Sequence, residues 1–260
     1  MPGPAPAGAA RLFADADGSG VRVCVLDTGI EGGHPMIGAV ETAMRVTTGP
    51  TGNLTVEPTE ATDRVGHGTA CAGVIRSIAP RCSITSVQVL NLGKAGTGQV
   101  LLAGLRWALS EGYDVINMSL SASKPAIRDE LAGLCDQAYF QRSILCAAMH
   151  NNGMPSYPWT FASVISVACM ERRATEARSG HFPQVQYSEQ PPAEFLAPGI
   201  GVRVAWTSGS TIKSTGNSLA APYISGLCAL LLSKRPGLTP FEVKTILHRI
   251  SISEGRNVGH

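Results

Sequence analysis

The sequence is poor in charge, and the charge it has is nearly balanced. Asp, Glu, Lys and Arg make up 15% of the 260 residues, and the formal net charge is +2. Proteins that bind nucleic acid or anionic membrane surfaces usually carry clustered positive charge. We therefore expect neither nucleic acid nor a membrane as a partner. The low charge, together with 44% hydrophobic residues, predicts a folded globular protein.

A long apolar run is also missing. The most apolar stretch, residues 227–232, is too short to span a bilayer. Residues 1–6 do not combine a basic segment with a following apolar one, so no signal peptide is expected.

The seven cysteines show no Cys-x-x-Cys spacing, and their number is odd. Most of them lie inside apolar runs, as Cys24, Cys146 and Cys228 do. This pattern fits neither a disulfide framework nor a zinc site. We expect no metal and no cofactor, and reduced core thiols that suit a cytoplasmic protein. An excised domain of a longer protein would show the same pattern.

Apolar runs alternate with segments of helical periodicity. Strands are expected at residues 21–26, 83–89, 115–118, 143–148 and 164–169, and helices at residues 99–110, 125–140 and 239–250. This alternation predicts an α/β fold with a doubly wound, mainly parallel sheet and helices on both faces. Residues 1–20 are expected to be a flexible lead, residues 21–255 a single domain, and residues 47–62 a surface loop.

Three short segments carry residues suited to catalysis. Asp27 ends the first expected strand, His67 stands between two glycines, and Ser218 lies where a loop enters a helix. Each alone has a commoner explanation, as a turn-capping Asp, a structural His or a helix-capping Ser. Together they supply a nucleophilic hydroxyl, a base to take its proton, and a carboxylate to orient that base.

The order Asp, His, Ser along the chain is the order of the subtilisin triad. The segments D-T-G, H-G-T and G-N-S-L-A-A-P, at Asp27, His67 and Ser218, are similar to the three signatures of the subtilisin-like serine peptidases. The resemblance extends from about residue 21 to residue 250. It implies the subtilisin-like fold, with these three residues as the catalytic triad and a peptide or protein as substrate.

The resemblance also implies further site residues. Asn151, in C-A-A-M-H-N-N-G, matches the asparagine that donates a hydrogen bond to the oxyanion. The segments expected to pair with an extended substrate, or to line its specificity pocket, contain Ser119, Leu120, Ser121, Gly96, Gly98 and Ser156. Asp63 could favour a basic substrate side chain, although a solvated loop residue is the commoner role.

The sequence departs from the family pattern at several positions. Ser121 and His150 replace glycines, and Cys71 replaces a valine beside the catalytic histidine. Met36 stands where many bacterial subtilisins have a calcium-binding aspartate, so the strong calcium site is expected to be missing. No prodomain of useful length precedes the domain, which fits a compact intracellular peptidase or part of a longer protein.

The sequence therefore predicts a serine endopeptidase that hydrolyses peptide bonds through an acyl-enzyme, with peptide maturation as a candidate role. Two alternatives remain at this point. One is a macrocyclase or transpeptidase with the same triad. The other is a non-catalytic peptide-binding protein on the same fold.

Overall fold

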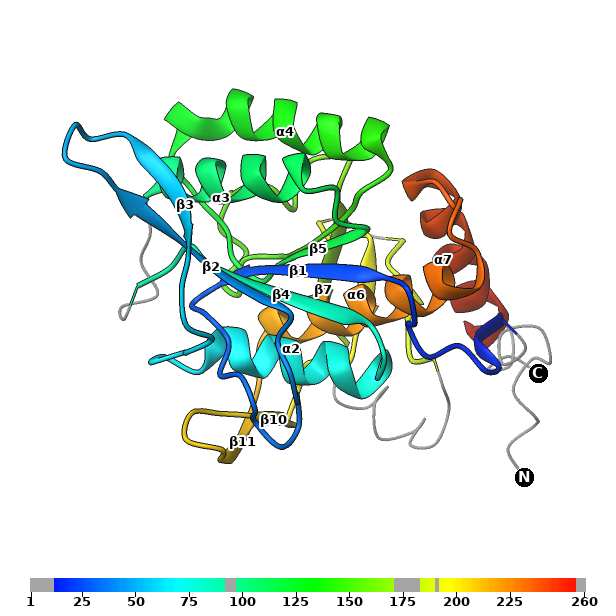
Figure 1. The fold of residues 1–260 in the computed structure, drawn as a ribbon. Helices are drawn as coiled ribbons and strands as arrows, with labels where there is room; N and C mark the ends of the chain where they lie inside the picture. The colour runs from blue at the N-terminus through cyan, green and yellow to red at the C-terminus, as the bar shows by residue number, and fades with distance from the viewer. Residues whose placement is uncertain (1–11, 92–96, 171–182, 190–191, 256–260) are drawn as a thin grey trace.

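The computed structural model describes residues 12–91, 97–170, 183–189 and 192–255. A nine-stranded sheet runs through the molecule, with helices above and below it (Figure 1). The strand order is β3-β2-β4-β1-β5-β6-β7-β9-β8. The strands are β1 (Arg22–Asp27), β2 (Thr42–Thr48), β3 (Leu54–Pro58), β4 (Ser83–Gln88), β5 (Val115–Met118), β6 (Ile144–Ala148), β7 (Ile165–Cys169), β8 (Gln186–Tyr187) and β9 (Phe195–Ala197).

The sheet is parallel from β2 to β9, and only its two outermost pairs, β2–β3 and β8–β9, are antiparallel. Strand β5 is buried at all four positions and β6 at all five. Such continuous burial is expected of strands that are covered on both faces. The doubly wound, mainly parallel sheet predicted from the sequence is confirmed.

Helices cover both faces of this sheet. Helices α2 (His67–Ile78) and α6 (Asn217–Lys234) pack together on one face, and α3 (Gly98–Ser110) and α4 (Arg128–Gln141) on the other (Figure 1). Each face has its own hydrophobic cluster, with Ile75 and Leu227 in the first and Leu105 and Leu131 in the second. Among the residues that the structure describes, no helix is both long and apolar enough to cross a membrane.

The C-terminal helix α7 (Pro240–Gly255) corresponds to the helix expected at residues 239–250, and it begins with a capping box. The Thr239 backbone N–H donates to the Glu242 carboxylate at 2.8 Å, and the Glu242 N–H donates to the Thr239 hydroxyl at 3.3 Å. These reciprocal bonds satisfy two N–H groups at the start of the helix.

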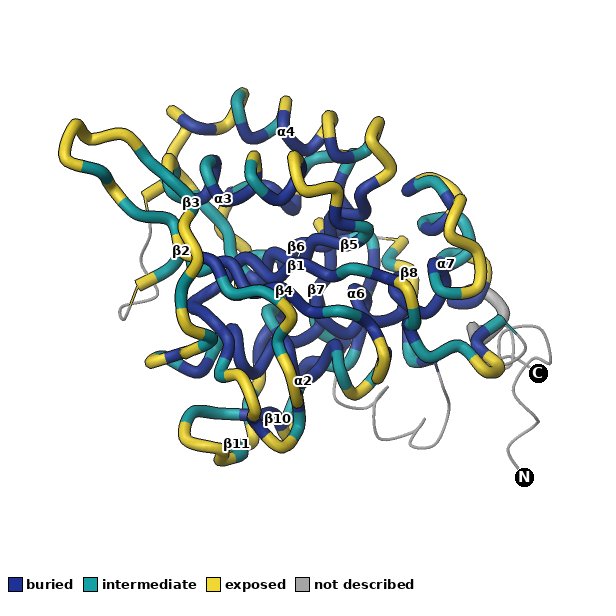
Figure 2. The backbone as a smooth tube through the Cα atoms, in the orientation of Figure 1, coloured by how far each residue is buried: buried dark blue, intermediate teal, exposed yellow. Residues whose placement is uncertain are grey.

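Two segments differ from the sequence-based expectation. The expected loop at residues 47–62 contains β3 and the end of β2, which form an antiparallel hairpin extending from the body of the molecule (Figures 1 and 2). The alternation of apolar and polar side chains at residues 54–57 is short, and it lies in a segment rich in Gly, Pro and Thr, which favoured a loop. Within the segment expected to be a flexible lead, the described residue Phe13 is instead buried in the hydrophobic core.

The strand order places a switch point at β1. Strand β4 pairs with one side of β1 and β5 with the other, and α3 connects β4 to β5 across the sheet. Ligands of doubly wound sheets bind outside the carboxyl ends of the strands at such a point. Asp27, the last residue of β1, occupies this position.

Candidate active site

Asp27 and His67 form a close pair at the switch point. The His67 Nδ1 atom lies 2.7 Å from Asp27 Oδ1, and the Asp27 side chain is only 1% exposed. The Thr28 backbone N–H donates to the same Oδ1 atom at 2.8 Å. A carboxylate accepts hydrogen bonds, so this contact places the His67 proton on Nδ1 and leaves Nε2 as the basic nitrogen.

The glycines beside His67 allow this pair to form. A Cβ atom on Gly68 would overlap the carbonyl oxygen of Gly29 and lie 3.0 Å from the Asp27 Cβ. Gly66 precedes α2 at a positive φ of 92°, and a Cβ there would lie 2.7 Å from the Trp206 ring. The two glycines therefore permit close approach by neighbouring parts of the protein.

Asp63 holds the start of α2 in place. Its carboxylate accepts from the backbone N–H groups of Val65 and Gly66, each at 2.9 Å, and from the N–H and hydroxyl of Thr69 at 3.0 and 2.8 Å. The residue is buried. Asp63 is therefore neither a solvated loop residue nor a free recognition group, because its oxygens are taken up by the N-terminus of the helix.

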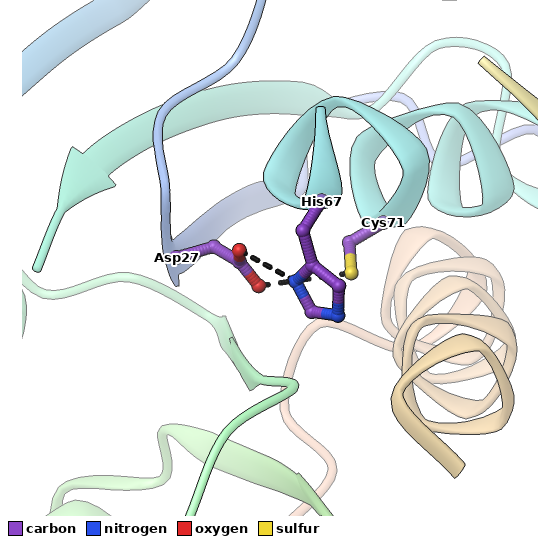
Figure 3. A group of neighbouring side chains, drawn as sticks. All are labelled: Asp27, His67 and Cys71. Carbon is purple, nitrogen blue, oxygen red and sulfur yellow. Dashed lines mark hydrogen bonds and ion pairs between the residues drawn. The ribbon is translucent and has the colours of Figure 1, made fainter. Parts of the chain in front are cut away.

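Cys71 completes the group around Asp27 (Figure 3). Its Sγ atom lies 3.7 Å from Asp27 Oδ2 and 3.5 Å from the Ser218 carbonyl oxygen. Burial, and then the nearby Asp27 charge, raise the pKa of the Cys71 thiol well above its usual value. Asp27, His67 and Cys71 could together offer three metal ligands, but the Asp27 and His67 atoms are those of the catalytic pair.

Ser218 lies in the first turn of α6, one residue after the helix begins at Asn217. It is therefore not the helix N-cap, a position that Gly216 occupies. Pro222 lies in the sixth position of the helix, beyond its first turn. Because proline has no N–H, the Ser218 carbonyl lacks the usual intrahelical donor, and the Cys71 thiol lies beside it.

Asn151 lies close to Ser218. A Cβ atom on Gly216 would be 3.2 Å from Ser218 Oγ and 3.8 Å from the Asn151 Nδ2 and Oδ1 atoms. The Asn217 backbone N–H donates to Asn151 Oδ1 at 3.0 Å. This bond fixes the orientation of the amide, so its Nδ2 group can donate to a different partner. The glycine thus keeps the space between the nucleophile and the amide open.

Asn217 is a positioning residue that the sequence analysis did not single out. Its Oδ1 accepts from the Cys169 N–H at 2.8 Å, and its Nδ2 donates to the Met149 carbonyl at 3.2 Å. The side chain thereby joins the ends of β6 and β7 to the start of α6. In the sequence, the only signal was that Asn217 departs from the usual family motif at this position. Its hydrogen-bond partners lie 48 and 68 residues away along the chain.

A groove of about 460 Å³ collects most of the predicted site residues. His67, Ser218 and Asn151 line it, and Ser119, Leu120 and Ser121 form one side at the end of β5. His150, which replaces a family glycine, also lines the groove.

Three residues predicted to bind substrate are not placed in the groove. Ser156 is buried behind it, where its hydroxyl accepts from Trp159 Nε1 at 2.8 Å. Gly98 is the first residue of α3, and a Cβ there would meet Ile127 at 2.6 Å, so the glycine serves helix packing. Gly96 lies outside the described residues.

Met36 packs against the hydrophobic core, and its backbone N–H donates to His34 Nδ1 at 3.1 Å. A thioether is not a ligand for a hard cation. The expectation that this position offers no calcium ligand agrees with the structure, while the overall metal requirement stays a prediction.

A model of a known protein family identifies the family to which this fold and this site belong. The model of the subtilase family matches residues 18–256. The chain belongs to the subtilase family. Its fold and its activity as a serine endopeptidase, both inferred from the motifs, are thereby confirmed.

The sequence relatives agree with this assignment. Subtilisin DY from Bacillus licheniformis is 31% identical over 253 residues, which cover 92% of this chain and 86% of that protein. Subtilisin E from Bacillus subtilis strain 168 is 29% identical, with 87% of this chain and 59% of that protein covered. The chain thus spans less than two thirds of the second relative.

Solved structures show the same subtilase architecture. A psychrophilic protease superposes with a TM-score of 0.74 at 25% identity, covering 94% of this chain and 89% of that chain. A cold-adapted subtilisin-like serine proteinase gives a TM-score of 0.67 at 23% identity, covering 89% and 82%, and shows the fold alone.

Proposed function

We propose that Asp27, His67 and Ser218 act as the catalytic triad for peptide-bond hydrolysis, with Asn151 as an oxyanion donor. The observation that carries this assignment is the 2.7 Å contact between His67 Nδ1 and Asp27 Oδ1 beside the groove that contains Ser218 and Asn151. The family membership of the chain supports the same roles.

In the first half of the reaction, His67 Nε2 takes the Ser218 hydroxyl proton while Oγ attacks the peptide carbonyl carbon. The buried Asp27 carboxylate stabilises the resulting imidazolium through Nδ1. The protonated Nε2 then donates its proton to the leaving amine, the C–N bond breaks, and an acyl-enzyme remains on Ser218. Water, activated by the same His67, hydrolyses that ester and restores the Ser218 hydroxyl.

The negative oxygen of each tetrahedral intermediate is stabilised from two sides. The Asn151 Nδ2 group is one donor, since its Oδ1 atom is held by the Asn217 N–H. The Ser218 backbone N–H at the start of α6 is the other, because N–H groups in the first turn have no intrahelical acceptor. Donors fixed before the reaction stabilise charge that exists only in the transition state.

The substrate is a peptide or protein segment lying in the groove beside Ser119, Leu120 and Ser121. Main-chain pairing with this segment would hold the substrate extended, as in other cases of strand addition. The net charge of +2 gives no support for nucleic acid as an alternative substrate.

For the biological setting, we propose peptide maturation in the cytoplasm. All seven cysteines are free, and six of them are buried. Even the closest pair, Cys146 and Cys228, has its sulfur atoms 3.9 Å apart, well beyond a disulfide bond of about 2.05 Å. A fold that needs no disulfide is compatible with a reducing compartment.

A diverse peptide library, incubated with the protein and read by mass spectrometry, tests this function. We expect cleaved products with both new termini, and no products with the Ser218→Ala variant. Circular products would favour the macrocyclase alternative. Binding without any covalent change would favour the non-catalytic peptide-binding alternative.

A further inference from the structure

We propose that the protein binds an acidic side chain of its peptide substrate in a second pocket, which contains Arg45 and Arg64. The proposal rests on the peptidase function proposed above. The pocket has a volume of about 450 Å³, within the range of about 300–1,000 Å³ typical of ligand pockets. Leu90 lines both this pocket and the catalytic groove, so the two hollows adjoin.

The polar lining of this acid pocket favours a negatively charged group. Arg45 and Arg64 line it, together with Gln88, Asn91 and three threonines. None of its described lining residues is an aspartate or a glutamate. A substrate carboxylate would therefore meet positive charge and hydrogen-bond donors without a competing acid in the wall.

Arg64 belongs to the loop that leads into α2, three residues before His67. The adjacent Asp63 forms no ion pair with it, because both oxygens of the Asp63 carboxylate accept from the N–H groups at the start of α2 and from the Thr69 hydroxyl. Arg64 is exposed, and its guanidinium can follow a substrate carboxylate that lies close to the catalytic histidine.

Arg45 approaches the same pocket from β2, in the hairpin that the sequence analysis did not predict. Its cross-strand partner is Glu57, the nearest acid by strand register. Glu57 lies outside the pocket wall and accepts the Thr55 hydroxyl at 3.0 Å. Within the described residues, neither Arg45 nor Arg64 has an ion pair, whereas Arg106 is paired with Glu130.

The position of the pocket identifies the ligand as part of the substrate. A peptide whose scissile bond lies at Ser218 also passes Leu90, where a side chain directed away from the groove enters the acid pocket. Planar guanidinium groups recognise carboxylates through paired N–H donors. We therefore infer a preference for Asp or Glu at one fixed position of the substrate.

The test compares two peptides that differ only by Glu or Gln at the position where the library products show acidic enrichment. An exposed ion pair contributes up to about fivefold, and such factors multiply, so two arginines should give the Glu peptide an advantage of up to about 25-fold in kcat/KM. The advantage should shrink at high salt, because exposed charges are screened. Arg45→Gln and Arg64→Gln should each reduce it, and the double variant should abolish it without affecting the Gln peptide.

Arg203→Gln is the matched control, since it removes the same charge from an exposed position on β10 (Val202–Ala205), outside the acid pocket. It should leave the preference for Glu unchanged. Cleavage without any acidic enrichment, or a preference for Glu that persists in the double variant, would overturn the acid pocket but not the proposed peptidase function.

If the wild-type protein cleaves no peptide, the proposed function fails and the pocket is tested by binding. Fluorescent peptides that carry Glu or Gln at each position in turn are then titrated into the wild-type protein. Tighter binding of the Glu version, lost in Arg45→Gln/Arg64→Gln, supports the acid pocket. Equal binding of the two versions contradicts it.

Discussion

The Cys71 thiol lies on the side of the Asp27 carboxylate that His67 does not contact. His67 Nδ1 and the Thr28 N–H both bond to Oδ1, whereas the thiol approaches Oδ2 at 3.7 Å (Figure 3). The orientation of Asp27 is therefore set mainly by the Oδ1 contacts, and the thiol adds a weak donor to a buried carboxylate.

Replacing this thiol should have a small effect on catalysis. Cys71→Val keeps the buried side chain apolar and of similar size, while the two bonds to Asp27 Oδ1 remain. We expect kcat to fall by less than about tenfold, the effect of losing one modest hydrogen bond. Steady-state kinetics across pH measure this, with Cys71→Ser as the variant that restores a donor. A loss of several orders of magnitude would show that Cys71 is required to position Asp27.

The thiols should be unreactive in the folded protein. Burial is the larger of two causes that raise the pKa of Cys71, and the Asp27 charge is the other. The reactive thiolate form of Cys71 is therefore scarce at neutral pH. Burial likewise raises the pKa of Cys82 to about 11. We expect iodoacetamide at pH 7.5 to leave Cys71 unmodified, and to label all seven cysteines after denaturation without reductant. Rapid native labelling of Cys71, or a pair resistant to labelling when denatured, contradicts this expectation.

The helix bearing His67 should not tolerate a side chain at Gly68. The added Cβ of Gly68→Ala would overlap the Gly29 carbonyl and press on Asp27. Overpacking of this kind costs about 1–3 kcal/mol of unfolding free energy, and turnover should fall as well. Gly133→Ala in α4 is the matched control, because nothing lies within 4 Å of the added Cβ and the residue is exposed. Chemical denaturation should show Gly133→Ala to be stabilised by about 0.5–1 kcal/mol.

Chelation should leave most of the stability intact. The region around Met36 supplies a thioether packed on the core in place of a carboxylate. We expect the melting temperature in excess EDTA to stay within a few degrees of that in calcium, because loss of about 1 kcal/mol would shift it by about 2–4 °C. A large fall that added calcium reverses would reveal a structural cation site.

The Asn151 amide should contribute mainly to the transition state. Asn151→Ala removes the Nδ2 donor, and we expect kcat to fall roughly 10²–10³-fold, the cost of losing one oxyanion donor. KM should change little, since the charge that this donor meets is absent from the bound substrate. Asn152→Ala is the neighbouring control and should keep kcat nearly unchanged. A change confined to KM would instead assign Asn151 to substrate binding.

The sequence predicted the buried part of this molecule better than its edges. Strands β1 and β5 to β7 are largely apolar runs, and Asp27 could be placed because such strands end at a common edge of the sheet. The β2–β3 hairpin could not be predicted. Its residues are mostly polar, and their backbone hydrogen bonds form only when the two strands pair at the edge of the sheet. Arg45 was therefore not connected with the active site.

The local motifs identified which residues act, but not how they are held. Asn217 and Cys71 make contacts that cross 48 to 147 residues of chain, and no sequence spacing reveals them. The same holds for Ser156 and Gly98, which the family pattern favoured as substrate contacts. The structure shows that they contact Trp159 and Ile127, while their role in substrate binding stays a prediction.

Labelling with a serine-directed fluorophosphonate, followed by mass-spectrometric mapping of the modified residue, tests the central assignment most directly. The account predicts one phosphonylated residue, Ser218, in the wild-type protein, no labelling of Ser218→Ala, and labelling slowed by orders of magnitude in His67→Ala because the base is gone. Undiminished labelling of Ser218→Ala, or a label mapped to Cys71, would contradict the assignment of Ser218 as the nucleophile.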